Sequence, residues 1–138
     1  MEASTLPIYF ANAAATLREH PDGYAIFEYA PGKRQFTEFQ AVLTHLSNLL
    51  RTKSLYKILG DQRLMVPFTD EERAWVTAYW LDLTRLRPGA LYAAVLLAND
   101  VFARLSATQL RYDNKEAALT YRLFENRTEA VAWLRQLG

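Results

Sequence analysis

The stretch that decides the fold is residues 55–63, LYKILGDQR, followed after a short loop by residues 69–75, TDEERAW. The apolar start of the first segment predicts a short strand that ends on a polar cluster. In the second segment, Thr69 and Glu72 have the spacing of a capping box at the start of a helix. A strand that leads through a polar junction into a helix is typical of α/β folds, which bind ligands and partners at the carboxyl ends of their strands.

The composition indicates one globular domain spanning residues 1–138, of which 51% are hydrophobic and 22% charged. Lysine and arginine number 16 against 15 acidic residues, and the resulting net charge of +1 argues against a nucleic-acid binder. The chain has no cysteine, which excludes disulfides, thiolate catalysis and cysteine-ligated metals.

The sequence shows no targeting or membrane-spanning segment. The first residues include Glu2, have no basic start and lead into no long apolar stretch, so we expect no signal peptide. The longest apolar run, residues 91–98, is far shorter than the roughly 20 residues of a membrane span. We therefore predict a soluble, cytoplasmic protein.

A β-hairpin is predicted near the N-terminus. Residues 13–20 and 24–30 flank the turn signal Pro-Asp-Gly at residues 21–23. Lys33 and Arg34, which follow a Pro-Gly pair, are interpreted as a solvated turn.

The first helix is predicted from a single apolar stripe between Phe39 and Leu50. Thr37 and Gln40 have the spacing of a capping box at its start.

The rest of the chain alternates strands with helices. The strands are predicted at residues 55–59, 92–98 and 119–124, and the helices at residues 69–86, from 101 onward after an Asn-Asp cap, and from 126 onward. Residues 107–118 fit either an extension of the third helix or irregular structure. The order β-β-α-β-α-β-α-β-α predicts right-handed crossovers and an open, mixed sheet of about five strands with about four helices.

Several segments, in this order, carry a resemblance to a known family. They are Gly60-Asp61-Gln62-Arg63 at the end of a strand, Trp75 and Trp80 on the next helix, residues 95–106 (VLLANDVFARLS) and residues 124–134 (FENRTEAVAWL). With them the chain resembles the SpoIIAA-like, or STAS-type, α/β domains, in particular a branch of short bacterial single-domain proteins. The resemblance covers residues 24–137.

The resemblance implies a signalling role with one departure from the family pattern. In the family's anti-sigma-factor antagonists, a phosphorylated serine or threonine follows the equivalent strand. Here Asp61 is followed by QRLM, and the next hydroxyl is that of Thr69, whose capping role explains it. Some relatives of this fold resemble CRAL-TRIO lipid-binding domains, which would imply an apolar ligand cavity.

Polar residues follow each strand that precedes a helix, and we expect them at one edge of the sheet. They are Asp61, Gln62, Arg63, Asn99, Asp100, Glu125 and Asn126. Helix capping and local backbone bonds are the commoner roles of such residues taken singly. We single out Asp61 with Arg63 as the functional pair.

The second helix carries apolar residues most of the way round. Val76, Trp80 and Leu83 are expected on the sheet, with Tyr79 as a further candidate. This leaves Trp75 and Leu86 for an interface, where aromatic residues are enriched. Equally, the helix fits between the sheet and the loop at residues 64–68.

The sequence shows no enzymatic signature. It has no nucleophile–base pair, no phosphate-binding loop and no metal-ligand spacing, and His20 and His45 have no evident partner. We therefore expect neither a cofactor nor a metal. Carboxylate chemistry by Asp61 and Asp100 is the least favoured hypothesis.

The leading hypothesis is a non-enzymatic signalling or protein-interaction module that binds through Asp61, Arg63, Asn99, Asp100 and Trp75. A homodimer formed through the second helix is one expectation, with an unidentified protein as the other partner. The alternative is a protein that binds a small apolar or lipid-like ligand beneath the second helix. It rests on the family analogy and on the 3 Trp, 8 Tyr and 7 Phe residues.

Overall fold

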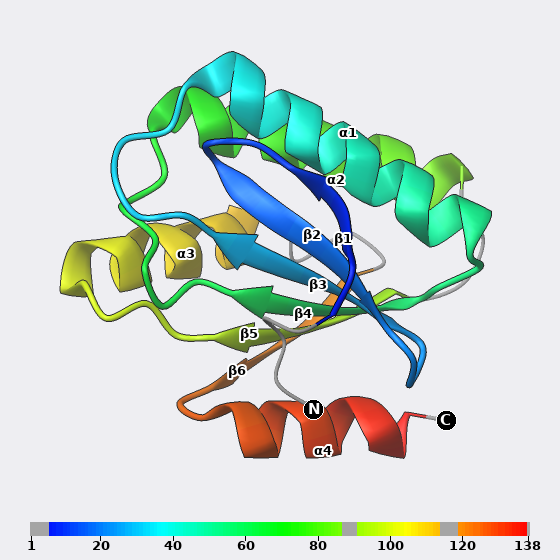
Figure 1. Cartoon of the computed structure of the whole chain (residues 1–138). Coiled ribbons are helices and arrows are strands. Elements are labelled where there is room, and N and C mark those ends of the chain that lie inside the picture. The colour runs from blue at the N-terminus through cyan, green and yellow to red at the C-terminus, as the bar shows by residue number, and fades with distance from the viewer. Residues whose placement is uncertain (1–5, 87–90, 114–118, 138) are drawn as a thin grey trace.

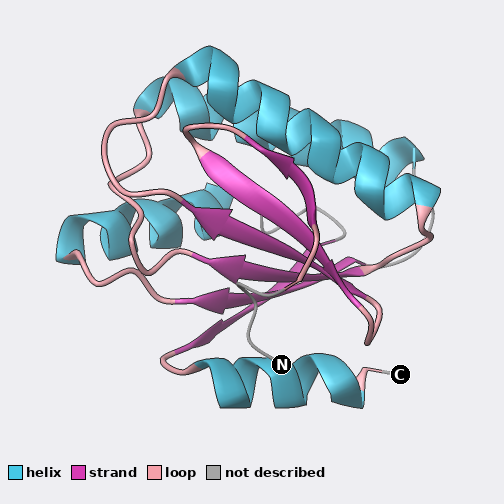
Figure 2. Cartoon of the chain, in the orientation of Figure 1, coloured by secondary structure: helices cyan, strands magenta, loops and turns pink. Residues whose placement is uncertain are grey.

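The computed structural model describes residues 6–86, 91–113 and 119–137 and shows a mixed sheet with helices on both faces (Figures 1 and 2). The strands are β1 (Ile8–Ala11), β2 (Ala15–His20), β3 (Tyr24–Tyr29), β4 (Lys57–Asp61), β5 (Leu91–Leu96) and β6 (Leu119–Phe124). The helices are α1 (Phe36–Thr52), α2 (Asp70–Leu86), α3 (Val101–Asp113) and α4 (Arg127–Gln136).

The strands lie in the sheet in chain order, from β1 to β6. β1, β2 and β3 are antiparallel neighbours, and β3, β4, β5 and β6 are parallel. Every crossover therefore steps to the next strand in the same direction. Crossovers of one hand then place α1, α2 and α3 on the same face of the sheet, whereas α4 follows the last strand and covers the other face (Figure 1).

The sheet buries apolar side chains on both faces, and β3 shows the alternation. Ala25 and Phe27 belong to the core on the face of α1, α2 and α3. Tyr24 and Ile26 point to the opposite face and share a second core with α4. Burial on both faces explains why β5 is nearly all apolar, as the sequence predicted for a central strand.

The prediction of about five strands was wrong, because β1 adds a sixth. β1 pairs with β2 in an irregular register between Ile8 and Phe10, and Ile8 and Tyr9 are exposed. A short edge strand of this kind has no buried face to produce apolar alternation. The turn that follows is held by Asn12, whose side-chain oxygen accepts a hydrogen bond from the Ala14 backbone N–H at 2.9 Å.

Three of the four predicted side-chain caps are confirmed, the one at Asp100 being described with the site below. The Thr69 hydroxyl accepts from the Glu72 N–H at 3.0 Å, and the Glu72 carboxylate accepts from the Thr69 N–H at 2.9 Å. Asn126 caps α4 by accepting from the Glu129 N–H at 2.9 Å.

The capping box predicted for Thr37 and Gln40 was wrong. α1 begins at Phe36 with Gln35 as its N-cap, and no side chain caps it. Thr37 therefore lies inside the first turn and is exposed. The chain enters α1 directly after Arg34, which tertiary contacts described below hold in place, so the helix start is set by packing rather than by a local cap.

The remaining boundaries agree with the alternation in the sequence. α3 continues to Asp113, so residues 107–113 extend the helix, and residues 114–118 lie outside the described residues. The side chains of Trp80, Leu83 and Leu86, expected on the sheet or at an interface, are also outside the described part. Among the residues described, no helix combines the length and apolar character that a membrane crossing requires.

Candidate functional site

A polar cleft of about 310 Å³ lies at the carboxyl ends of β3 and β4. We call it the strand-end cleft; its walls are Glu28, Tyr29, Asp61, Arg63, Leu64 and Asn99. This is the edge at which open α/β sheets bind ligands.

Asp61 and Arg63 form a two-pronged ion pair in this cleft. The guanidinium donates from Nε to Oδ1 at 3.0 Å and from Nη2 to Oδ2 at 2.7 Å, and the Arg63 backbone N–H donates to Oδ1 at 3.1 Å. The side chain of Asp61 is 11% exposed and that of Arg63 is 49% exposed. The hydrogen bonds that its guanidinium donates to Asp61 raise the pKa of Arg63. A buried carboxylate thus fixes the orientation of a guanidinium that faces solvent.

The other carboxylate of the cleft is also paired. Glu28 accepts from Arg18 Nε at 2.9 Å. Both acids of the cleft are therefore paired with an arginine. A general acid or base needs a carboxyl group that can exchange a proton with the substrate, and these two carboxylates are engaged in ion pairs instead. The cleft is suited to polar recognition.

Asn99 is the third predicted residue that reaches the cleft. Its backbone N–H donates to the Arg63 carbonyl oxygen at 3.0 Å, which joins the loop after β4 to the loop after β5. The structure thus brings together Asp61, Arg63 and Asn99.

Asp100, Glu125 and Asn126 do not line the cleft. Asp100 accepts from the Phe102 N–H at 2.8 Å and caps α3. The convergence of Asp61, Asp100 and Glu125 considered from the sequence is therefore not observed. Within the described ranges, no group of three or more histidines and acids has the arrangement to hold a metal ion.

Trp75 lies away from the cleft and is taken up by packing. Its ring meets those of Phe36 and Phe39 edge-on, at centroid distances of 6.4 and 6.3 Å, and stacks on Tyr79 at 5.3 Å. The Tyr79 hydroxyl donates to the Leu43 carbonyl oxygen at 2.6 Å, and burial raises the pKa of Tyr79 to about 12. Trp75 and Tyr79 therefore dock α2 on α1, and the expected leftover face is not found at Trp75.

An exposed apolar surface lies on α3 and the neighbouring loop instead. Leu64 is 58% exposed, Val101 60%, Phe102 67% and Leu105 61%. We call these four residues the α3 face. The bond between Asn99 and Arg63 brings the loop that carries Leu64 to the start of α3, so the α3 face borders the strand-end cleft.

A buried ion pair between Arg34 and Glu72 was missed by the sequence interpretation. Arg34 Nε donates to Glu72 Oε2 at 3.0 Å and Nη2 to Oε1 at 2.9 Å, and the two side chains are 2% and 3% exposed. The guanidinium also lies 5.4 Å from the ring centroid of Phe68. The prediction that Arg34 belongs to a solvated turn was wrong, because its partner is 38 residues away in the sequence.

Both histidines have partners that the sequence did not reveal. The ring of His45 stacks on Phe10 of β1 at a centroid distance of 3.8 Å. His20 Nδ1 accepts from the Asp22 N–H at 3.0 Å, and its burial lowers its pKa. Their roles are local packing and turn formation.

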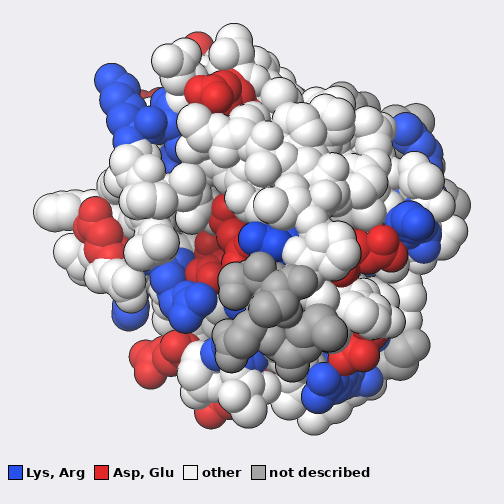
Figure 3. All heavy atoms as spheres, viewed as in Figure 1, with Lys and Arg blue, Asp and Glu red and all other residues white. Residues whose placement is uncertain are grey.

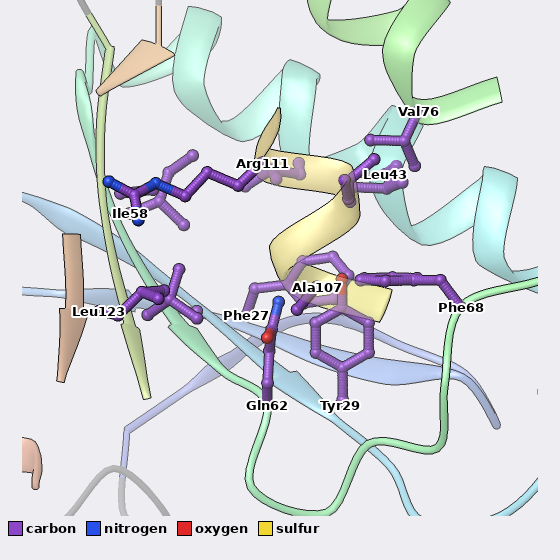
Figure 4. A pocket seen from close by; sticks show the side chains of 15 residues that line it. Phe27, Tyr29, Leu43, Ile58, Gln62, Phe68, Val76, Ala107, Arg111 and Leu123 are labelled. Carbon is purple, nitrogen blue, oxygen red and sulfur yellow. The ribbon is translucent and has the colours of Figure 1, made fainter. Parts of the chain in front are cut away.

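A second hollow, which we call the interior cavity, lies between the sheet and helices α1, α2 and α3 and is partly open to solvent (Figure 4). Its volume is about 70 Å³ and its walls are mainly apolar, with Val76 of α2 among them. The sequence predicted an alternative ligand site beneath this helix.

Charged side chains of both signs are interspersed on the face shown in Figure 3, in keeping with the net charge of +1.

No family model, curated protein or solved structure matches the chain. Membership of the STAS-type domains stays a prediction.

Proposed function

We propose that the chain is a non-enzymatic protein-interaction module that binds its partner through the α3 face and the adjoining strand-end cleft. The observation that carries this proposal is the exposure of four large apolar side chains beside an oriented Arg63. An apolar patch with a polar rim is typical of protein-interaction sites.

The charges around the α3 face define the chemistry of the partner. Arg104 is exposed on α3 and the cleft adds Arg63, held by Asp61. Asp100, at the start of α3, is also exposed, but its carboxylate accepts from the Phe102 N–H. A matching surface presents apolar side chains flanked by carboxylates. The resemblance to STAS-type domains supports a binding role, and the absence of a hydroxyl at residues 62–65 argues against the family's phosphorylation switch.

Photo-crosslinking in cells that produce the protein tests the proposal. A photoreactive amino acid replaces Leu105, and Thr44 on the exposed side of α1 is the control position. We expect a crosslinked protein from position 105 that is lost with Phe102→Ser and retained with Ile8→Ser, since Ile8 is exposed but distant in the sheet. Equal products from both positions, or products insensitive to Phe102→Ser, would contradict the proposal.

Sedimentation velocity over a range of concentrations separates self-association from binding of another protein. A second copy as the partner predicts a dimer that Phe102→Ser dissociates and Ile8→Ser does not. A monomer at every concentration rejects the homodimer and directs the search to the crosslinked protein.

A further inference from the structure

The interior cavity contains a buried amide, that of Gln62, for which the described residues supply no hydrogen-bond partner. Gln62 directly follows β4 and is 8% exposed. Its backbone N–H donates to the Leu96 carbonyl oxygen at 3.1 Å and its carbonyl accepts from the Met65 N–H at 3.0 Å. Figure 4 shows the carboxamide pointing into the cavity. Among the described residues, nothing forms a hydrogen bond with this carboxamide, and such a buried polar group calls for an explanation.

Tyr29 brings a second polar group to the same cavity. Its ring is fixed by Phe27 at 4.7 Å and by Phe68 at 5.9 Å between ring centroids. Figure 4 shows the ring beside Gln62, with the hydroxyl directed into the cavity. Burial raises the pKa of Tyr29, so the phenol is neutral and can donate or accept a hydrogen bond. Within the described part of the chain, this hydroxyl also has no hydrogen-bond partner.

The other described residues of the cavity wall are mainly apolar, with Leu43, Val76 and Leu123 among them. Arg111 is the one charged residue among the described lining; it is exposed and lies on the opposite side of the cavity from Tyr29 (Figure 4). A ligand's charged group placed beside Gln62 would thus lose its hydration without meeting an opposite charge, which is costly.

The size of the cavity limits the ligand. Its volume of about 70 Å³ exceeds the roughly 10–15 Å³ that one water needs and is below the roughly 300 Å³ at the lower end of drug-sized sites. The occupant therefore has only a few non-hydrogen atoms.

We infer that the interior cavity binds a small neutral organic molecule, a short apolar chain with one uncharged oxygen function, whose oxygen is hydrogen-bonded by Gln62 and Tyr29. The apolar chain packs against Leu43, Val76 and Leu123. This inference does not rest on the α3 face, and either proposal can fail without the other.

An NMR titration with three small probes tests the inference on the full chain. Xenon reports apolar space alone, 1-propanol adds a hydroxyl, and propionate adds a charge at similar size. We expect xenon and 1-propanol to shift the methyl signals of Leu43, Val76 and Leu123. The 1-propanol shifts should saturate, and propionate should bind about tenfold or more weakly because its carboxylate would be desolvated.

Variants separate the polar contacts from the space itself. Gln62→Met keeps the length of the side chain and removes the amide, and Tyr29→Phe keeps the ring contacts. Each should weaken 1-propanol binding about tenfold and leave xenon binding unchanged. Gln40→Met on α1 is the matched control. Gly60→Ala should weaken both probes, since its methyl group would enter the cavity with ordinary contacts, the nearest to Val95 at 3.8 Å.

Three results would overturn the inference. The first is the absence of saturation by 1-propanol, which would leave ordered water as the occupant. The second is 1-propanol binding that Gln62→Met and Tyr29→Phe do not change. The third is propionate binding tighter than 1-propanol and lost with Arg111→Gln.

Discussion

The molecule contains two arginine–carboxylate pairs of the same geometry in opposite settings. Arg34 and Glu72 are almost completely buried and lie 38 residues apart in the sequence. Arg63 and Asp61 are two residues apart, and the guanidinium is half exposed. Both pairs join two guanidinium nitrogens to two carboxylate oxygens.

The difference shows what each pair does. Arg34 also donates to the Val66 and Pro67 carbonyl oxygens, each at 3.1 Å, so its polar contacts replace the lost water. It ties the entry of α1 to the cap of α2. The Arg63 guanidinium is held by Asp61 through Nε and Nη2, and among the described residues its Nη1 has no hydrogen-bond partner, so this side faces the strand-end cleft. Burial makes one pair structural, and exposure leaves the other for recognition.

Breaking the buried pair has the largest expected effect. Arg34→Met leaves the Glu72 carboxylate without its cation, and we expect the free energy of unfolding to fall by about 3–5 kcal/mol. Urea unfolding measures the change. Lys33→Met, which removes the neighbouring exposed cation, should have little effect.

The double variant Arg34→Met with Glu72→Leu sharpens this test. If the cost arises from a stranded charge, the double variant should be more stable than Arg34→Met alone. Equal loss in Arg34→Met and Lys33→Met would show that Arg34 is not structural.

Breaking the exposed pair should change stability much less. Asp61→Asn retains an oxygen for the Arg63 N–H but loses the charge, and we expect a decrease of about 1 kcal/mol or less because Arg63 is solvated. The crosslinked product from position 105 should decrease, since Arg63 loses its fixed orientation. A loss of stability as large as that of Arg34→Met would erase the distinction between the two pairs.

The smallest effect is expected at a third pair, on the surface. Arg135 donates to Asp22 at 2.9 Å, and this hydrogen bond lowers the pKa of Asp22 below its ordinary 3.8. A lowered carboxyl pKa contributes stability above pH 3.8 that is lost as the pH falls through the folded-state value. Arg135→Gln should raise the pKa of Asp22 toward 3.8, as measured by NMR titration, without a detectable change in urea unfolding at neutral pH. An unchanged pKa would show that the pair does not form in solution.

Local signals were the part of the fold that could be read from the sequence. The Thr69–Glu72 box, the Asn126 cap and the turn at Gly23, whose φ is +91°, need only neighbouring residues, and all are found. Thr37 and Gln40 have the same spacing but form no cap, because the contact of Arg34 with distant Glu72 fixes the start of α1. A cap motif in the sequence is therefore not sufficient evidence of a cap, and α1 shows that a helix can begin without one.

α3 shows most clearly what local pattern leaves open. Val101 and Leu105 have helical spacing, and so do Ala103 and Leu110, so either pair could face the sheet. The structure buries Ala103 and Leu110 and exposes Val101 and Leu105. The small residue at 103 lets the helix approach the sheet closely, and this cannot be deduced without knowing the space available.

The candidate site divides in the same way. Asp61 with Arg63 is a contact between near neighbours, and it was predicted. Three features were not predicted, because they depend on contacts between distant elements. They are the packing of Trp75 against α1, the cavity around Gln62 and the pairing of Arg34 with Glu72.

By itself the sequence determined the α/β alternation, the hairpin and the polar end of β4, because periodicity, turns and caps act over a few residues. Only the tertiary structure decided how far each side chain is removed from water: Arg34 is buried, Trp75 is partly buried between helices, Phe102 is exposed and Gln62 faces a cavity. Burial is a property of the assembled layers, and it determines whether a polar or apolar residue supports the fold or is left for a partner.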